Sequence, residues 1–146
     1  MKIALASDHK GYRLKEEIIE ELKNKYEILD LGTNSEESVD FPIYGIKVGE
    51  TIKNKEADLG IVICGTGIGI SIAANKVKGV MCAKISNEEE AKLAKEHNNA
   101  NVIALSGNLE KETALNMIKI FIEAKPNQEE KYQRRIEQIL KYENEC

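Results

Sequence analysis

The stretch Ala57–Ser71 (ADLGIVICGTGIGIS) places a thiol next to a glycine-rich turn. Its first part, Leu59–Ile63, is a short apolar run that is typical of a strand buried on both faces. Cys64 then leads into the turn, and the residues after Gly69 can continue as a helix. Such a turn leaves the N–H groups of the first helical turn free to bind negative charge. The stretch therefore predicts a backbone cradle for an oxyanion or a small phosphate, with a thiol at its mouth.

Cys64 and the glycines also have an interpretation that involves no chemistry. The letters CGTGIG match neither the dinucleotide fingerprint nor a P-loop, and a tight strand-to-helix turn alone explains the glycines. A thiolate is favoured near a helix N-terminus, where it can act as a base or a nucleophile. A buried, apolar role is the commoner fate of a cysteine, and it suits Cys82 better than Cys64. The absence of a C-x-x-C pair argues against a redox role.

The two histidines both stand at polar junctions between predicted elements. His9 follows the first apolar run, and His97 lies in the polar segment Glu96–Asn101. A lone histidine is commonly a satisfied surface or core residue, but this shared placement favours a functional role. The pair Arg134-Arg135 suits either phosphate binding or a solvated helix face. No cluster of His, Cys and Asp has metal-ligand spacing, so no metal is expected.

Apolar runs and helical periodicities alternate along the chain, which predicts βαβ units and a parallel sheet. The expected fold is α/β, a three-layer Rossmann-like arrangement in which a five-stranded parallel sheet carries helices on both faces. The predicted strands are Lys2–Ala6, Tyr26–Leu31, Leu59–Ile63, Gly79–Ala83 and Asn101–Leu105. The predicted helices cover about residues 11–24, 44–53, 70–75, 87–97, 114–122 and 128–143. Such sheets bind ligands at the carboxyl ends of their strands, where Asp8, Cys64 and Ser106 stand.

Composition limits the function classes. The 146 residues suffice for one domain, predicted over residues 1–146, and are 42% apolar and 32% charged. A formal net charge of -4 argues against a nucleic-acid-binding or membrane-surface protein. No apolar run approaches the about 20 residues of a membrane span. Reduced thiols and a cytoplasmic location are expected, because the odd set of cysteines has no paired spacing: Cys64, Cys82 and Cys146.

A series of motifs occurs in a consistent order from residue 1 to about residue 140. The motifs are Ser7-Asp8-His9, Gly11-Tyr12, Gly32-Thr33, Ser38–Pro42, Ile63–Ser71, Ala74-Asn75-Lys76, Glu96-His97-Asn98 and Ala100-Asn101. Together they resemble the type B ribose-5-phosphate isomerases, a family that includes the galactose-6-phosphate and allose-6-phosphate isomerases. The glycine loop is specific, and its combination with the early Asp-His and late His-Asn pairs is more specific still.

The resemblance implies an aldose–ketose isomerisation through a cis-enediolate, without a metal or a cofactor. In this reaction Cys64 is the base that moves a proton between C2 and C1 of the open-chain sugar phosphate. His97 opens the furanose ring together with Thr66. Backbone N–H groups of the turn stabilise the enediolate oxygen, as in an oxyanion hole, and they belong to Gly65, Gly67, Ile68 and Gly69.

The resemblance also implies how the substrate is held. Asp8 and Asn98 bind the hydroxyl groups of the sugar. The C-terminal helix, about residues 128–143, lies at a homodimer interface and reaches the site of the other subunit. Pairing of the dimers into a homotetramer stays open, and no nucleic acid or membrane is expected as a partner. The phosphate is bound from both subunits, by His9 and by two residues of the last helix, Lys131 and Arg135.

Two positions depart from the family pattern. Gln128–Tyr132 replaces the usual Gly-Gly-Arg-His segment, so Lys131 stands in place of an arginine. Asn108 stands where many members carry a second arginine. An ammonium group lacks the bidentate geometry with which arginine binds phosphate. Ribose 5-phosphate is the first expectation, since the cysteine and the early Asp-His pair match that branch. The alternatives are a six-carbon phosphosugar (allose 6-phosphate or galactose 6-phosphate) and a non-catalytic protein that binds a phosphosugar or a nucleotide.

Overall fold

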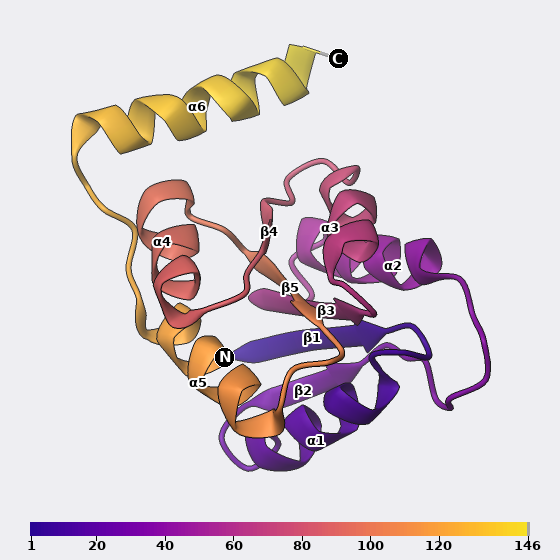
Figure 1. Ribbon diagram of the computed structural model, residues 1–146. Helices are drawn as coiled ribbons and strands as arrows, with labels where there is room; N and C mark the ends of the chain where they lie inside the picture. Colours follow the sequence, from indigo (N-terminus) through magenta and orange to yellow (C-terminus); the bar gives the residue numbers. More distant parts are fainter. Residues whose placement is uncertain (146) are drawn as a thin grey trace.

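Residues 1–145 are described by the computed structural model, in which five parallel strands form one sheet (Figure 1). The strands, in the spatial order β2-β1-β3-β5-β4, are β1 (Lys2–Ser7), β2 (Glu27–Asp30), β3 (Leu59–Cys64), β4 (Cys82–Lys84) and β5 (Val102–Ser106). The helices are α1 (Tyr12–Leu22), α2 (Phe41–Lys53), α3 (Ile68–Asn75), α4 (Glu88–Asn98), α5 (Lys111–Glu123) and α6 (Glu130–Glu145). The predicted α/β fold with a parallel sheet is confirmed.

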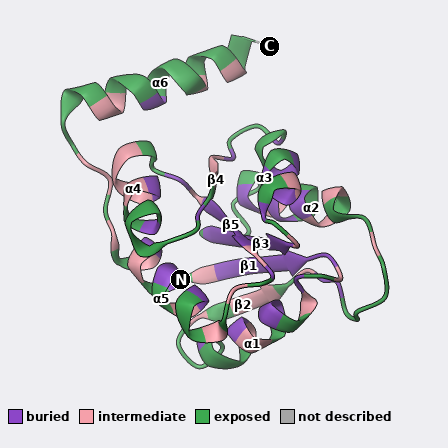
Figure 2. Cartoon of the chain, viewed as in Figure 1, coloured by how far each residue is buried: buried purple, intermediate pink, exposed green. Residues whose placement is uncertain are grey.

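The central strands are buried on both faces, because their side chains alternate between two apolar clusters. In β3, Leu59, Ile61 and Ile63 pack toward α1, α4 and α5. Val62 and Cys64 point to the other face, toward α2 and α3. Figure 2 shows the result, with buried strands in the centre and exposed outer faces on the helices. The predicted three-layer arrangement follows from this alternation.

β1 and β3 are neighbours in the middle of the sheet, and the chain leaves them toward opposite edges. β1 continues through α1 to the edge strand β2, whereas β3 continues through α3 to β4 on the other edge. The N–H of Asp8 donates to the carbonyl of Ile63 at 3.1 Å and ties the two strand ends together. Open α/β sheets bind their ligands at such a switch point, outside the carboxyl ends.

β4 is shorter than predicted, because asparagine side chains replace strand pairing around it. The strand predicted over 79–83 begins only at Cys82. Asn101 Oδ1 accepts the N–H of Met81 at 2.8 Å, and Asn101 Nδ2 donates to a backbone carbonyl of the same segment, that of Gly79, at 2.9 Å. On the outer edge, the amide of Asn75 pairs with both the N–H and the carbonyl of Cys82. Side chains therefore cover an edge that would otherwise be open to pairing.

Two helices begin where local chemistry favours a start. α2 begins at Phe41 rather than at the predicted Tyr44, because Pro42 fits the first turn of a helix. α4 begins after Asn87, whose Oδ1 accepts the N–H of Glu90 at 2.8 Å. Asn87 is thereby the N-cap of α4. The earlier start of α2 makes Phe41 part of the cavity described below.

α6 stands apart from the layers of the fold, beyond α4 (Figure 1). Of its described residues only Ile136 is buried, and Ile139 and Tyr142 expose 47% and 72% of their surface. The predicted C-terminal helix is present, over Glu130–Glu145. The chain leaves part of its apolar surface uncovered.

Candidate active site

A cavity of about 360 Å³ lies at the carboxyl ends of β1 and β3. Several residues that the sequence predicts for the site line it together: Asp8, His9, Cys64, Gly65, Thr66 and Gly69. Lys10 and the segment that leads into α2 complete the lining: Ser38, Val39, Asp40 and Phe41. The cavity therefore joins the two strand ends that the sequence singled out with a loop that arrives from β2.

The Cys64 thiol is held by the turn that follows it. Cys64 is 5% exposed, and the N–H of Gly67 donates to its Sγ at 3.2 Å. Gly67 has a φ of 81°, and a Cβ there would lie 2.9 Å from the carbonyl carbon of Leu105, so the turn requires glycine. This N–H fixes the sulfur at the turn, in the place that a base or a nucleophile would occupy.

Of the two described cysteines Cys64 is the more deeply buried, although the sequence favoured a buried, apolar role for Cys82. Cys64 is buried and Cys82 is half-buried, because strand alternation turns Cys64 inward while β4 lies at the edge of the sheet. Burial of the Cys82 thiol nevertheless raises its pKa to about 12. Cys82 therefore stays protonated near neutral pH and is a poor base.

The backbone cradle is partly occupied by the protein itself. Besides the Gly67 N–H on sulfur, the N–H of Ile68 donates to Thr66 Oγ1 at 3.0 Å. The N–H of Gly69, which stands on the cavity wall, has no acceptor within residues 1–145. The N–H of Gly65, on the same wall, likewise has no acceptor within residues 1–145. Gly65 and Gly69 are therefore the predicted N–H donors best placed to meet a substrate oxygen, and Ile68 can join them if the Thr66 side chain turns away.

Asp8 is fixed by the start of α1. It is 6% exposed, and its Oδ1 accepts the N–H groups of Lys10 and Gly11 at 3.0 and 3.1 Å. These two bonds hold the carboxylate in one orientation, while Oδ2 has no protein donor within the described chain. Oδ2 is thereby available to accept a hydroxyl group in the cavity, which fits the predicted role of Asp8.

His9 is fixed by the loop before α2. Its Nδ1 accepts the N–H of Val39 at 3.1 Å. A neutral imidazole that accepts at Nδ1 carries its proton at Nε2, so this bond assigns the tautomer. The Nε2–H group can then donate to an anionic oxygen, as the predicted phosphate role of His9 requires.

Phe41 is a wall residue to which sequence reasoning gave no role. A Cβ on Gly69 would lie 2.7 Å from the Phe41 ring, so only glycine lets α3 approach this ring so closely. The motif Ser38–Pro42 was visible in the sequence, but nothing in its letters indicated which of its side chains faces the cavity. The helix-starting Pro42 is the signal that could have placed Phe41 there.

A second group of predicted residues gathers around Tyr132, between α4 and α6. The rings of His97 and Tyr132 stack with centroids 4.4 Å apart and an interplanar angle of 11°. Lys131 Nζ and the Arg135 guanidinium lie 5.1 and 6.0 Å from the centre of the same ring. His97 thus belongs with the cationic residues of α6. Sequence reasoning gave Tyr132 no role in the site.

The two groups lie at opposite ends of the sheet within one chain. α4 ends at Asn98, just before β5 starts, so His97 stands near the amino ends of the strands. Cys64 stands at the carboxyl end of β3, whose six residues span about 20 Å. Asn98 lines a different cavity, with Asn75, Cys82 and Ile139 among its neighbours. Within a single chain, His97 and Asn98 therefore do not meet Thr66.

Residues 1–145 hold neither a cluster of metal ligands nor a membrane-spanning helix. No three His, Cys, Asp or Glu side chains lie close enough to hold a metal ion. No helix in that range is both long enough and apolar enough to cross a membrane.

Comparison with known proteins assigns the chain to a family. The family described as Ribose/Galactose Isomerase matches residues 3–139. The chain belongs to this family. The match covers both groups of site residues and confirms the resemblance that the motifs indicated.

Relatives and solved structures agree with the assignment over nearly the whole chain. A probable ribose-5-phosphate isomerase B of Mycoplasma genitalium is 42% identical over 147 residues, which cover 98% of this chain and 96% of that protein. The structure of Clostridium thermocellum ribose-5-phosphate isomerase B is 45% identical, with a TM-score of 0.95 over 99% of each chain. The Mycoplasma genitalium ribose-5-phosphate isomerase B with bound ribulose-5-phosphate is 42% identical, with a TM-score of 0.91 over 99% of this chain and 97% of that one.

Proposed function

We propose that this chain interconverts ribose 5-phosphate and ribulose 5-phosphate by aldose–ketose isomerisation. The observation that carries the proposal is the single cavity shared by Cys64, Asp8 and His9. These residues supply a base, an acceptor for sugar hydroxyl groups and a donor for phosphate. Membership of the family supports the proposal, as does the relative that holds ribulose-5-phosphate.

The proposed proton transfer runs through Cys64. Its thiolate removes the proton from C2 of the open-chain aldose, and the C–H electron pair forms the C1–C2 double bond of a cis-enediolate. The thiol then returns the proton to C1, while the proton of the C2 hydroxyl group passes to O1 and leaves the ketone at C2. The N–H of Gly69 stabilises the negative oxygen of the enediolate in the manner of an oxyanion hole.

The proposed site needs two chains, in a homodimer. His97, Lys131 and Arg135 stand together around Tyr132, whereas the Cys64 cavity of the same chain lies at the other end of the sheet. If the last helix of a second subunit brings Lys131 and Arg135 to this cavity, His97 must come with them. His97 would then open the furanose ring, and Asn98 bind a hydroxyl group, in the site of the partner.

Exposed apolar side chains support a second copy as the partner. α6 exposes Ile139 and Tyr142, and it stands apart from the layers of its own chain (Figure 1). Further large apolar side chains are exposed on α2 and α3, next to the cavity: Phe41, Ile43, Ile46, Ile68 and Ile72. Burial of both surfaces against a copy of the chain would remove them from water. Pairing of such dimers into a homotetramer stays open.

Arg135→Ala is expected to weaken phosphate binding across the proposed interface. Arg135 makes no ion pair within residues 1–145, whereas its neighbour Arg134 pairs with Glu130. The KM for ribose 5-phosphate should rise about tenfold or more, with little change in the unfolding midpoint, because a charge-assisted contact to phosphate is lost. Arg134→Ala is the matched control and should keep its KM. An unchanged KM for Arg135→Ala would show that this residue does not bind the phosphate.

A substrate panel tests the proposed reaction. Five- and six-carbon aldose phosphates are each incubated with the chain, and formation of the ketose is followed. Ribose 5-phosphate should give the highest kcat/KM. A higher kcat/KM for allose 6-phosphate or galactose 6-phosphate would favour the six-carbon alternative. The family description, which includes galactose isomerases, is the reason to test it. Tight calorimetric binding without any ketose would instead identify a non-catalytic phosphosugar-binding protein.

We also propose that residues 1–146 act as one isomerase domain in the cytoplasm. The family match over 3–139 supports the single domain, and the free thiols of Cys64 and Cys82 are consistent with a reducing compartment. The third cysteine, Cys146, lies outside the described residues.

A further inference from the structure

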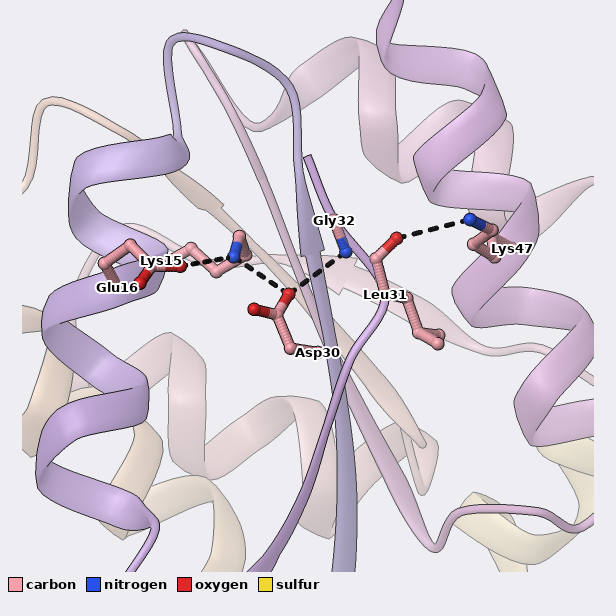
Figure 3. A network of polar contacts seen from close by, with 6 residues as sticks. All are labelled: Lys15, Glu16, Asp30, Leu31, Gly32 and Lys47. Carbon is pink, nitrogen blue, oxygen red and sulfur yellow. Dashed lines mark hydrogen bonds and ion pairs between the residues drawn. The ribbon is translucent and has the colours of Figure 1, made fainter. Parts of the chain in front are cut away.

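Lys15 of α1 carries a buried ammonium group. It is 0% exposed, and its Nζ donates to Asp30 Oδ1 at 2.9 Å and to Glu16 Oε1 at 2.8 Å (Figure 3). A lysine is almost never fully buried without such partners, so this contact is a specific feature of the fold. We propose that Lys15 is a positioning residue, which acts through Asp30 to hold Asp8 in its substrate-binding place. The inference rests on the proposed function.

A path of hydrogen bonds leads from Lys15 to the backbone of Ser7, the residue before Asp8. Asp30 Oδ1, which accepts from Lys15, also accepts the N–H of Gly32 at 3.1 Å (Figure 3). The carbonyl of Gly32 accepts the N–H of Ser7 at 2.6 Å, and the carbonyl of Ser7 accepts the N–H of Thr33 at 2.8 Å. Ser7 precedes Asp8 in the chain. The turn after β2 therefore fixes the backbone from which the Asp8 carboxylate projects.

The path closes on itself through the first turn of α1. The N–H of Gly11 donates to Asp8 Oδ1 at 3.1 Å, and the carbonyl of Gly11 accepts the backbone N–H of Lys15 at 2.9 Å. Lys15 thus holds the segment with Asp8 and His9 from both sides. Its backbone secures the α1 side, and its ammonium group secures the β2 side.

The turn after β2 is also contacted from the other face of the sheet. Lys47 of α2 donates to the carbonyl of Leu31 at 3.4 Å (Figure 3). This contact is long and exposed, so it contributes less than the buried one. Of the two lysines that reach this turn, Lys15 therefore makes the stronger contact, and it adds to the backbone hydrogen bonds with Ser7.

Replacing Lys15 removes the ion pair with Asp30 without leaving a buried, unpaired charge. The Asp30 side chain is 37% exposed, so water can solvate its carboxylate when the ammonium group is gone. The N–H of Gly32 also keeps its acceptor. What is lost is the tether between this carboxylate and α1. Since Cys64 lies on β3, the loss should affect substrate binding more than proton transfer.

Lys15→Met tests the inference, because methionine fills similar space without the charge. We expect the KM for ribose 5-phosphate to rise about tenfold while kcat stays within about threefold. Lys111→Met is the matched control, since it removes another ion pair of α1, with Glu21 at 2.6 Å, that has no path to Ser7. It should leave KM unchanged. An unchanged KM in Lys15→Met, or an equal rise in Lys111→Met, would overturn the inference.

If Lys15→Met does not fold, variants of Asp30 test the same positioning role through the KM for ribose 5-phosphate. Asp30→Ala should raise KM as Lys15→Met does. Asp30→Asn should stay near the wild-type KM, because its amide oxygen can still accept both hydrogen bonds. A wild-type KM for Asp30→Ala would contradict the positioning role.

Failure of the proposed function would be visible separately. If the wild-type chain binds inorganic phosphate in calorimetry but forms no ketose, the isomerase proposal fails and phosphate affinity replaces KM as the measurement. Lys15→Met should then weaken phosphate binding about tenfold, since His9 follows Asp8 in the held segment. Equal phosphate affinities for the two proteins would overturn the inference.

Discussion

Cys64→Ala is expected to lose isomerisation of ribose 5-phosphate by about 10³-fold or more while the protein stays folded. The proposed mechanism has one base, and its sulfur is the group on which the Gly67 N–H is aimed. Loss of a single small side chain from the α2/α3 cluster should cost about 1–2 kcal/mol of unfolding free energy. The rate of ketose formation and a denaturant titration measure the two effects separately.

Cys64→Ser is the control that separates the base from the turn. Its hydroxyl group can still accept the N–H of Gly67, so the geometry of the turn should persist. A hydroxyl group is a much weaker base than a thiolate, so turnover should remain lost. Substantial turnover by either variant would show that Cys64 is not the base.

His97→Asn is expected to lower kcat by about 10²-fold, because ring opening would lose its acid–base group. The variant also loses the ring that stacks on Tyr132, which should cost about 0.5–1.5 kcal/mol of stability. Steady-state kinetics and thermal unfolding measure the two effects. Tyr132→Phe is the matched control: it keeps the stack and should retain near-normal kcat. A wild-type kcat for His97→Asn would contradict the ring-opening role.

The sequence was most informative where chemistry and chain order coincide. Cys64 and Asp8 each follow an apolar strand directly, and parallel strands bring such ends together, so their meeting in one cavity could be expected. The role of Gly67 in the turn could also be predicted, because a glycine between a strand and a helix indicates a backbone conformation that other residues avoid. These features depend on neighbours in sequence and on one topological rule.

The rest depends on contacts between distant segments. Nothing near Val39 in sequence indicated that its N–H would fix the tautomer of His9. Lys15 is typical of the polar face of an amphipathic helix, and only the tertiary position of Asp30 explains its burial. The short β4 likewise follows from the side chains of Asn75 and Asn101, which compete with strand pairing.

The separation of His97 from Cys64 could have been inferred but was not. A helix in a parallel α/β fold returns the chain to the amino ends of the strands, so a histidine at the end of α4 must lie far from a cysteine at the end of β3. The sequence could not indicate which side chains contact His97. Its stack on Tyr132, beside Arg135, is a tertiary contact between α4 and α6.

A hybrid dimer tests the two-chain site most directly. Chains carrying Cys64→Ala and His97→Asn, each with a different affinity tag, are co-expressed, and the species that carries both tags is purified. One of its two sites then combines an intact Cys64 with an intact His97 from the other chain, so about half of the wild-type rate should return, from two nearly inactive parents. A hybrid no more active than its parents would contradict a site built across two chains.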